Sequence, residues 1–509
     1  MRQNINFEKI LHDYFNLQTF RQGQKEIIAD VLAGKDVLGV LPTGSGKSLC
    51  YQLPARLFNG QTIVVSPLIS LMVDQVKQLK ANGFKRVVAI NSFMSYEERR
   101  IVYNELVNYE LIYVSPEILQ QDHLLNRLKR LTIRLFVIDE AHCISQWGHE
   151  FRPDYLRLKN IIQQLNEPPV LALSATVTPQ VEQDILKALN RPTMTKHIYP
   201  VDRKNIILTI KETANDLEKN NYLYYILKNY QMPTLIYFSS RQATEQVANF
   251  LHTKLSKHRV SFYHGGMDAI DRLHIQQQFM NDQLDIICCT SAFGMGINKK
   301  NIRLVIHYHF PGDIESYVQE VGRAGRDGLS SLGIILYSND DIDIQNYIIQ
   351  QRFPEQNRLQ HIEKLLLQHS GGKFLPIQEK ISLILNDDDV HLQFLQYHLE
   401  KHGIIENNKI IEQQSKITEA FQQISLHIKN RYQFKMNKLQ KIVNLLQSNR
   451  CIRSSIYEYF KSTYERVEHC CSNCGFSLEE WQPKETILKR NISTENWKEK
   501  LSKLLLIEE

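Results

Sequence analysis

Residues 36–55 read DVLGVLPTGSGKSLCYQLPA. An apolar run typical of a buried strand leads into a short loop with two glycines, and the segment after the loop has the character of a helix. Gly44 and Gly46 allow the backbone to curl so that its N–H groups, with the start of the helix, point toward phosphate oxygens. Leu41 stands where the first glycine of the common pattern would be, yet the strand–loop–helix context still predicts a nucleotide-phosphate site.

Two groups of polar residues are expected to share the work at this site. Lys47 would reach the β- and γ-phosphates, and the Ser48 hydroxyl would ligate Mg²⁺. The predicted residues of the phosphate loop are Thr43, Gly44, Ser45, Gly46, Lys47 and Ser48. Asp139 and Glu140 follow a second apolar run, where parallel strands expose ligand-binding groups. We expect Asp139 to share the Mg²⁺ and Glu140 to orient and deprotonate the attacking water.

Strand-type runs alternate with helical stretches from about residue 30 to 340. The runs are 36–42, 62–67, 111–116, 134–140 and 170–176, then 234–240, 285–291, 303–309 and 333–338. Nearly continuous apolar strands separated by helices predict parallel sheets that are covered on both faces. The two series separate around residues 195–210, which predicts an α/β fold of two domains, 1–200 and 201–342, joined by a short linker.

The segment QEVGRAGRDG (319–328), called the arginine loop below, carries further phosphate-directed residues. Arg323 and Arg326 lie three positions apart among glycines, and their guanidinium groups could stabilise charge on a transferring γ-phosphoryl group. Gln319 is assigned to the same nucleotide site. Because these residues belong to the second domain, ATP is expected to lie between two domains and to open and close the cleft between them, as in a motor.

Composition sets broad limits on the partners. The chain has 509 residues, 23% of them charged and 43% hydrophobic, with a formal charge of +6. This length predicts three or four domains, and the mild basic excess agrees with a nucleic-acid partner. No apolar run approaches the ~20 residues of a membrane span, and the N-terminus lacks a signal-peptide core. We therefore expect a cytoplasmic protein, associated with the nucleoid if bacterial, with no membrane partner.

The stretch DEAHCISQWGHEFRPDY (139–155) extends beyond the acidic pair. A metal site is disfavoured because no second ligand cluster lies nearby in sequence, and Cys143 and Ile144 are suited to the core. The remainder is too polar for a buried strand, and aromatic side chains on a loop suit stacking on DNA bases. The residues predicted to contact or report DNA here are Gln146, Trp147, His149, Phe151 and Arg152.

Several segments together resemble the RecQ family of DNA helicases in superfamily 2. They cover about residues 5–340 in family order and include FRQGQKEII (20–28), LPTGSGKSLCYQLPA (41–55), VSPLISLMVDQV (65–76), VSPE (114–117), DEAHCISQWGHEFRPDY (139–155), LSAT (173–176), IYFSSR (236–241), YHGGM (263–267), FGMGINKKNIRLVIH (293–307) and IESYVQEVGRAGRDG (314–328). The resemblance implies two RecA-like motor domains. It also implies ATP-dependent unwinding of duplex DNA, three-prime to five-prime, in repair and recombination.

The resemblance further implies individual roles. Phe20, Arg21 and Gln24 would read adenine, and Ser174 and Thr176 would link hydrolysis to domain movement. His142 and Gln146 would relay the DNA signal to the ATP site. The single-strand path would be lined by the segments around Ser66, Pro67, Pro116, His264 and Thr290. A groove that binds backbone phosphates loses affinity steeply with added salt.

The C-terminal cysteines resemble the zinc-binding helical platform of the family, predicted here over 436–480 and followed by a helical tail, 481–509. Cys451 would be the first ligand, and Cys471 and Cys474 match the next two. The fourth position falls on Ser477, so Cys470 is the expected substitute, with His469 behind it. Four cysteines would bind Zn²⁺ tetrahedrally. The alternative is a platform that keeps its helices and has lost the metal. The other four cysteines, Cys50, Cys143, Cys288 and Cys289, are expected to be buried small side chains.

Residues 343–435 are predicted to be a helical region that is longer than the usual connection. Within it, 376–411 combines two helical stretches, an apolar turn and a small hairpin, which suits a helix-turn-helix or winged-helix module. A plain helical linker fits equally well. Few residues follow Cys474, so neither the usual C-terminal winged helix nor an HRDC domain is expected. We hypothesise that 376–411 is a relocated winged-helix-like DNA contact.

Three functions compete. The first is a DNA helicase that acts on single-stranded and duplex DNA, with a monomeric motor expected and single-strand-binding or repair proteins as candidate partners. The second is an RNA helicase, because DEAH also occurs there, although the aromatic-rich segment and the platform argue against it. The third is a DNA-binding adaptor with a decayed ATPase, which the retention of Lys47, Asp139, Glu140 and both arginines disfavours.

Overall fold

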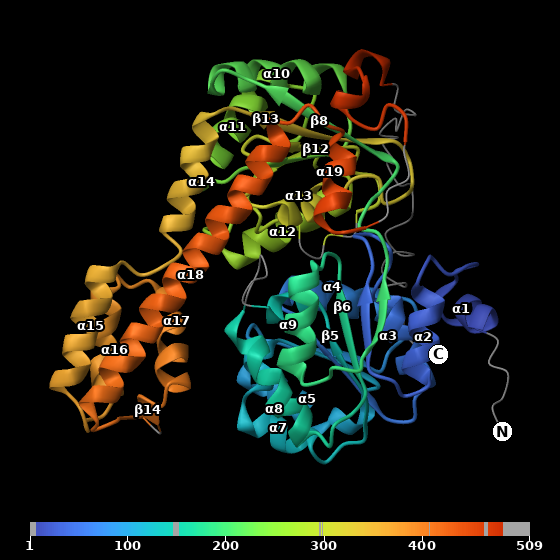
Figure 1. The fold of residues 1–509 in the computed structure, drawn as a ribbon. Coiled ribbons are helices and arrows are strands. Elements are labelled where there is room, and N and C mark those ends of the chain that lie inside the picture. Colours follow the sequence, from blue (N-terminus) through green and yellow to red (C-terminus); the bar gives the residue numbers. More distant parts are fainter. Residues whose placement is uncertain are drawn as a thin grey trace. The chain divides into compact units, whose positions relative to one another are not determined.

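The structure is a computed structural model that describes residues 7–145, 152–294, 297, 299–406, 408–462 and 467–481 (Figure 1). The chain forms two compact units. The first, called the motor unit, comprises the chain up to residue 311, residues 315–338 and the chain from residue 448 onward. The second, called the helical unit, comprises 312–314 and 339–447.

The first half of the motor unit is a seven-stranded parallel sheet in the order β3-β4-β2-β5-β6-β1-β7. Its strands are β1 (Val37–Val40), β2 (Gln61–Val65), β3 (Val87–Ile90), β4 (Leu111–Val114), β5 (Ile133–Ile138), β6 (Val170–Ser174) and β7 (Thr195–Ile198). Successive residues of β2 enter different core clusters: Ile63 and Val65 pack in one, and Val64 in another. The sheet is therefore buried on both faces, which explains its continuous apolar strands.

Helices connect these strands. They are α1 (Phe7–Phe15), α2 (Gln24–Leu32), α3 (Leu49–Leu57), α4 (Ile69–Ala81), α5 (Tyr96–Asn104), α6 (Pro116–Leu119), α7 (Asp122–Leu128), α8 (Leu158–Gln164) and α9 (Pro179–Leu189), with 3₁₀ turns η1 (Leu106–Asn108), η2 (Ala141–Ile144) and η3 (Pro153–Arg157). Helix α5 begins with a reciprocal capping box, in which Ser95 accepts from the Glu98 N–H and Glu98 accepts from the Ser95 N–H.

The second half of the motor unit is a six-stranded parallel sheet in the order β10-β11-β9-β12-β13-β8. The strands are β8 (Ile206–Glu212), β9 (Thr234–Tyr237), β10 (Val260–Tyr263), β11 (Ile286–Cys289), β12 (Leu304–His307) and β13 (Ser331–Tyr337). The helices are α10 (Asp216–Asn229), α11 (Arg241–Lys254), α12 (Ala269–Met280) and α13 (Ile314–Val321). Two parallel-sheet domains of the RecA type are thus present, as predicted. The four cysteines Cys50, Cys143, Cys288 and Cys289 are buried, also as predicted.

The sequence prediction of a linker over 195–210 was wrong in its extent. Strands β7 and β8 occupy most of that segment, and only residues 199–205 connect them. Strand β7 is an edge strand in which half-buried and exposed residues alternate, so it lacks the apolar run that marked the other strands. Strands β3 and β10 were missed as well, and both are also edge strands.

The helical unit is built around one long helix. It contains α14 (Asp340–Gln350), α15 (Gln356–Gln368), α16 (Leu375–Ile384), α17 (Asp389–Lys401), the hairpin strands β14 (Ile405–Glu406) and β15 (Lys409–Ile410), and α18 (Gln414–Leu446). Residues 371–373 pair with the hairpin. The Gly371 N–H donates to Ile410 O, and the backbones of Lys373 and Lys409 form an antiparallel β-bridge. The two helices and the hairpin lie where the sequence suggested them within 376–411.

The chain then returns to the motor unit as α19 (Ile452–Tyr459) and the turns η4 (Ser472–Cys474) and η5 (Leu478–Glu480). The Leu208 N–H donates to Cys470 O at 3.2 Å, so this segment covers the open edge of β8. Trp481 is buried in the core of the second sheet, and its indole N–H donates to Ser330 Oγ at 3.1 Å. Among the described residues, no helix is long and apolar enough to cross a membrane.

Candidate active site

The phosphate loop connects β1 to the start of α3. Gly44 and Gly46 have φ angles of +80° and +79°, in the left-handed region that favours glycine. A Cβ atom on Gly46 would lie 2.8 Å from Gln24 Nε2, so close packing also requires glycine there. Lys47 and Ser48 are half-buried beside the first turn of α3. The loop therefore has the backbone conformation of an anion-binding loop at a helix N-terminus, and its role toward phosphate stays a prediction.

Two of the residues assigned to adenine recognition contact the phosphate loop directly. The Gln24 side-chain amide donates to Ser45 O at 2.8 Å and to Gly46 O at 3.0 Å. Its oxygen accepts from the Arg21 N–H, and the Arg21 guanidinium donates to Gly44 O. Phe20 is half-buried against the cluster formed by α1, α2 and α3. These contacts fix the loop from the side of α2.

Asp139 lies just beyond the end of β5, beneath the phosphate loop. Only 8% of its surface is exposed. Burial and the neighbouring Glu140 charge raise the pKa of Asp139 to about 7, and the Lys47 charge opposes this rise. The Tyr155 hydroxyl donates to Asp139 O at 3.1 Å and fixes the strand end from below. A buried carboxylate in this position suits a divalent cation, whose positive charge would favour the ionised form of Asp139.

Glu140 turns the chain away from the strand. Its φ of +49° is left-handed, and its N–H donates to Asp139 Oδ1 at 3.0 Å. The carboxylate lies 3.4 Å from His142 Nδ1, and this nitrogen is also 3.0 Å from Ser174 Oγ. Ser174 in turn donates to Thr176 O at 3.1 Å. A continuous polar chain thus connects the acidic pair to the end of β6.

The arginine loop follows α13 and meets the phosphate loop. A Cβ atom on Gly322 would lie 3.1 Å from Thr43 Cβ, and one on Gly44 would lie 2.9 Å from Arg326 Cγ. Gln319 and Arg323 are buried, and the Arg323 and Arg326 guanidinium groups donate to Gly294 O and Ile297 O. Burial and the charges of Arg323 and Arg203 lower the pKa of Arg326 to about 9. The structure therefore brings the predicted arginines to the nucleotide site.

The residues predicted to contact DNA are less fully described. Gln146, Trp147, His149 and Phe151 lie outside the described residues. Arg152 is half-buried, and its N–H donates to Cys143 O at 3.0 Å.

The residues assigned to the single-strand path are mostly enclosed. Ser66, Pro67 and Pro116 are buried and Thr290 is half-buried. His264 is buried, with Nε2 2.8 Å from Glu245 Oε1 and Nδ1 accepting from the Gly266 N–H at 3.2 Å. Their roles toward DNA stay predictions.

The C-terminal cysteines converge. The sulfur atoms of Cys451, Cys470, Cys471 and Cys474 all lie within 4.8 Å of one another. The Cys451 sulfur is 3.6 Å from that of Cys470 and 3.9 Å from that of Cys471, and none of the four cysteines forms a disulfide. Tetrahedral Zn²⁺ with Zn–S bonds of about 2.3 Å sets sulfurs about 3.8 Å apart. The four residues therefore fit a zinc ion, with Cys470 as the fourth member.

Sequence reasoning missed three residues next to the nucleotide site. Asp202, Arg203 and Asn205 lie in the connection between β7 and β8, and Arg203 donates to Thr43 O of the phosphate loop at 3.0 Å. Their segment, VDRKN, carries neither an apolar period nor a phosphate-binding pattern. The only signal was two basic residues in a presumed linker, which is common on protein surfaces.

Comparison with known proteins agrees with this geometry. Residues 21–185 match the DEAD/DEAH box helicase family, and residues 218–328 match the helicase conserved C-terminal domain. The chain is 40% identical over 484 residues to the probable ATP-dependent DNA helicase RecS of Bacillus subtilis, an alignment that covers 94% of this chain and 93% of RecS. It is 41% identical over 361 residues to the ATP-dependent DNA helicase RecQ of Haemophilus influenzae, covering 69% of this chain and 58% of RecQ.

Solved structures show the same fold at lower identity. The helicase Lhr of Mycobacterium smegmatis, bound to ssDNA and AMP-PNP, superposes with a TM-score of 0.56 at 18% identity, over 73% of this chain and 55% of Lhr. Dbp5 of S. cerevisiae, bound to RNA and ADP BeF3, gives a TM-score of 0.55 at 19% identity, over 67% of this chain and 90% of Dbp5. Sequence identity across nearly the whole length of RecS decides the family. The chain belongs to the RecQ family of ATP-dependent DNA helicases.

Proposed function

We propose that the chain hydrolyses ATP to move three-prime to five-prime along single-stranded DNA, and that this movement unwinds duplexes in repair and recombination. The observation that carries the proposal is the meeting of three elements in one unit: the phosphate loop, the acidic pair and the arginine loop. Each supplies a separate requirement of phosphoryl transfer, namely phosphate binding, water activation and charge stabilisation.

The chain's own residues divide the reaction as follows. Lys47 and the loop N–H groups bind the phosphates, and Ser48 with Asp139 would hold Mg²⁺, which neutralises phosphate charge when bound. Glu140 orients the attacking water and takes its proton. The chain from Glu140 through His142 to Ser174, with contacts of 3.4 and 3.0 Å, links that base to β6. Arg323 and Arg326 offset charge on the transferring group.

Coupling to DNA is assigned to the segment after the acidic pair. Trp147 and Phe151 would stack on bases, at about 1–3 kcal/mol per base, and Arg152 would contact a phosphate. His142 and Gln146 would pass the signal to Glu140. Trp147→Ala should bind ATP normally yet lose most of the DNA-stimulated hydrolysis. An unchanged stimulated rate would mean that Trp147 has only a packing role.

Zinc is proposed for the cysteine cluster. Cys451 is the N-cap of α19, and its sulfur accepts from the Ser454 N–H at 3.4 Å. Cys470 and Cys471 lie where the chain pairs with β8. A zinc ion supplies structural cross-linking here, because four thiolate ligands leave no open position for catalysis. It would join α19 to the edge of the second sheet.

The helical unit is proposed as a second DNA contact. Its order of α15, the bridging residues 371–373, α16, α17, the β14–β15 hairpin and α18 is that of a winged-helix module. One core joins these elements, with Ile362, Ile381, Leu395 and Ile417 fully buried. In such modules the later helix of the pair enters the major groove. Helix α17 is therefore the candidate recognition helix.

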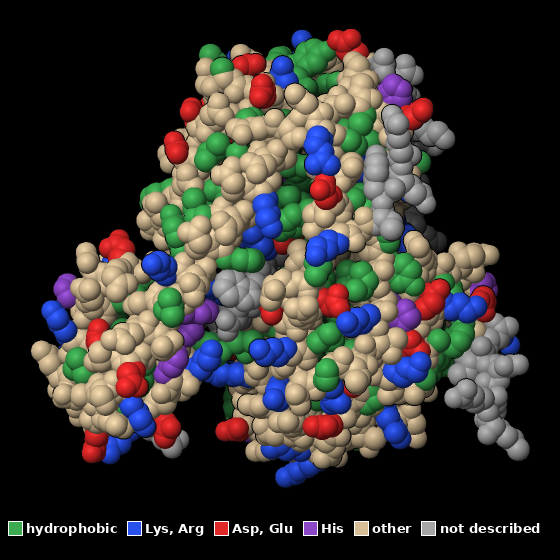
Figure 2. All heavy atoms as spheres, viewed as in Figure 1, with side chains coloured by type: hydrophobic (Ala, Val, Ile, Leu, Met, Phe, Trp, Pro, Cys, Tyr) green, Lys and Arg blue, Asp and Glu red, His purple; other side chains and the backbone are tan. Residues whose placement is uncertain are grey.

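The surface of α17 suits this role. Gln393 and Lys401 are exposed along the helix, and His402 is exposed at its C-terminal end. Figure 2 shows histidine side chains gathered over this part of the helical unit. Lysine and glutamine are common donors to phosphates and base edges. The hairpin adds Lys409, which is also exposed, so two neighbouring elements offer contacts to one duplex.

One experiment separates DNA from RNA as the substrate. Matched DNA and RNA duplexes with identical sequences and single-stranded tails are incubated with the chain and ATP, and strand displacement is followed by fluorescence. The proposal predicts displacement on DNA and little or none on RNA. Faster displacement of RNA would favour an RNA helicase, and displacement of neither, without DNA-stimulated hydrolysis, would favour an adaptor.

A further inference from the structure

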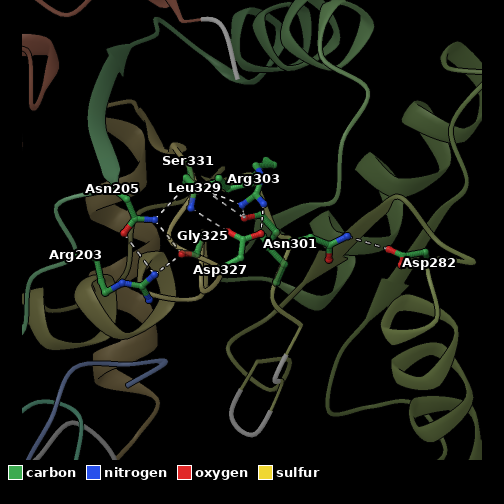
Figure 3. A network of polar contacts seen from close by, with 10 residues as sticks. Arg203, Asn205, Asp282, Asn301, Arg303, Gly325, Asp327, Leu329 and Ser331 are labelled. Atoms are coloured by element: carbon green, nitrogen blue, oxygen red, sulfur yellow. Dashed lines mark hydrogen bonds and ion pairs between the residues drawn. The ribbon is translucent and has the colours of Figure 1, made fainter. Parts of the chain in front are cut away.

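Arg203 contacts both loops of the nucleotide site, and Figure 3 shows its contact with Gly325 of the arginine loop. One guanidinium nitrogen, Nη1, donates to Thr43 O in the phosphate loop at 3.0 Å and to Gly322 O in the arginine loop at 3.4 Å. The other, Nη2, donates to Gly325 O in the arginine loop and to Asn205 Oδ1. A planar fork of donors suits such a bridge between two backbone segments, and a single ammonium group does not.

The arginine loop is also braced from its own domain. Asn205 donates to Gly325 O at 2.9 Å and to Leu329 O at 2.8 Å. The buried Arg303 pairs with Asp327 and donates to Ser331 Oγ at 3.2 Å (Figure 3). These contacts fix the loop within the second domain. Arg203 adds a hydrogen bond to the phosphate loop of the first domain, where Gly322 and Arg326 of the arginine loop also pack closely.

The preceding residue connects the same point to the cysteine platform. Asp202 pairs with Arg453 and accepts from the Tyr457 hydroxyl at 3.0 Å. Arg453 is 1% exposed and also donates to Arg203 O at 3.3 Å and to Ile206 O. Arg453 and Tyr457 belong to α19, which begins directly after Cys451 of the cysteine cluster. The dipeptide Asp202-Arg203 thus touches the platform on one side and the nucleotide site on the other.

The charge around Arg203 favours an anionic ligand. Burial lowers the pKa of Arg203, the nearby Arg21 charge lowers it further, and Asp327 and Asp202 oppose this. Its four described acceptors are three backbone carbonyls and one amide oxygen, so these contacts add no negative charge. Like charges around the phosphate loop repel each other, and a triphosphate bound there would offset this repulsion.

We propose that Arg203 is a positioning residue of the ATPase: it fixes the arginine loop against the phosphate loop, and Asp202 connects this contact to the platform helix α19. The inference rests on the proposed ATP hydrolysis. Arginine side chains act on a transferring phosphoryl group only when held in the right place, and a shift of about 1 Å costs roughly 100-fold in rate. Arg203 therefore affects the rate of ATP hydrolysis, whereas the phosphate loop and Gln24 determine the affinity for ATP.

The test compares Arg203→Gln with Lys204→Gln, which removes the same charge from the exposed neighbouring residue. ATP affinity, DNA-stimulated kcat and KM, and the melting temperature are measured for both. Arg203→Gln should keep ATP affinity within about threefold and lose roughly tenfold or more in kcat, because the arginine loop loses its position. Lys204→Gln should match the wild type in all of them.

Two further variants distinguish a loss of positioning from a folding defect in Arg203→Gln. Arg203→Lys keeps the charge but has no fork, so it should resemble Arg203→Gln in kcat. Full rescue by lysine would overturn the positioning role. Tyr457→Phe removes the hydroxyl bond to Asp202 and should lower kcat about threefold in the wild-type background, and by less when Arg203→Gln is already present. Equal effects in both backgrounds would overturn the connection to α19.

The remaining outcomes are also decisive. A wild-type kcat for Arg203→Gln, or a rise in KM alone, would overturn the proposal and leave the helicase function intact. Failure of the wild-type chain itself to show DNA-stimulated hydrolysis would overturn the proposed function, and the role of Arg203, which rests on it, would be overturned as well. The two failures are therefore distinguishable.

Discussion

Glu140 combines an unfavourable backbone conformation with a half-buried carboxylate. Its φ of +49° lies where a non-glycine residue is strained by about 1–2 kcal/mol. The turn directs the side chain away from β5, and the carboxylate lies 3.4 Å from His142 Nδ1. Strain of this kind persists where surrounding structure fixes it, as the Tyr155 and Ser174 contacts do here. The geometry suits a general base placed beside Asp139, the proposed Mg²⁺ ligand.

Glu140→Gln tests that role. The amide keeps the shape of the side chain but cannot accept the proton of the attacking water, so kcat for ATP hydrolysis should fall by about 10²–10⁴. ATP affinity should change little, because the phosphate loop is untouched. Glu105→Gln, on an exposed glutamate of the same domain, is the control and should retain the wild-type rate. A Glu140→Gln rate within threefold of wild type would exclude Glu140 as the base.

The nucleotide residues could be predicted because their pattern is local. Lys47, Ser48 and the acidic pair follow strands within a few positions, so sequence alone indicates where they end up. Arg203 could not be predicted in this way. Its partners Gly322 and Thr43 lie 119 and 160 positions away along the chain, and only the packing of two sheets brings them together. No local pattern encodes such a contact.

Strand prediction succeeded where both faces of a strand are buried and failed at the sheet edges. Strands β1, β2, β5, β9 and β12 lie inside their sheets and read as continuous apolar runs. Strand β7 has the sequence TKHI, with two exposed positions, and it was taken for linker. Edge strands need only one apolar face, so their sequences resemble loops.

The cysteine cluster leads to a testable prediction, namely that Cys470 is the fourth zinc ligand. Because four sulfur atoms lie within 4.8 Å of one another, purified chain should contain one zinc per molecule. Cys470→Ser should lose most of that zinc and melt at a lower temperature, since structural zinc contributes to folding. The adjacent substitution His469→Ala is the matched control and should retain the metal. Zinc loss in His469→Ala with full retention in Cys470→Ser would reverse the assignment, and zinc-free wild-type chain would refute the site.

A second prediction concerns helix α17, which is expected to contact duplex DNA through Lys401. Lys401→Glu, on its exposed last turn, should weaken binding to duplex DNA and reduce the slope of log K against log salt by about 0.9, as expected for one lost phosphate contact. Lys364→Glu makes the same charge change on the exposed face of α15 and should have a smaller effect. Equal affinity and slope for both variants and the wild type would show that α17 does not contact DNA.

At the scale of the whole molecule, the two kinds of relative differ in what they share with the chain. The alignment with RecS spans 484 residues, and the alignment with Haemophilus RecQ spans 361. The shorter alignment is long enough to include both sheets, but it is too short to include the helical unit and the C-terminal segment as well. The sequence indicated a helical insertion of this kind by its composition. Its separation into a compact unit with one core could be seen only once the helices were packed.

The most direct measurement follows unwinding of two DNA duplexes that differ only in having a three-prime or a five-prime single-stranded tail. Wild-type chain and Lys47→Ala are compared with and without ATP. We predict rapid, ATP-dependent unwinding of the three-prime-tailed duplex by the wild type, little on the five-prime-tailed one, and none on either by Lys47→Ala. Unwinding by Lys47→Ala at the wild-type rate, or a preference for the five-prime tail, would contradict an ATP-driven motor of the proposed direction.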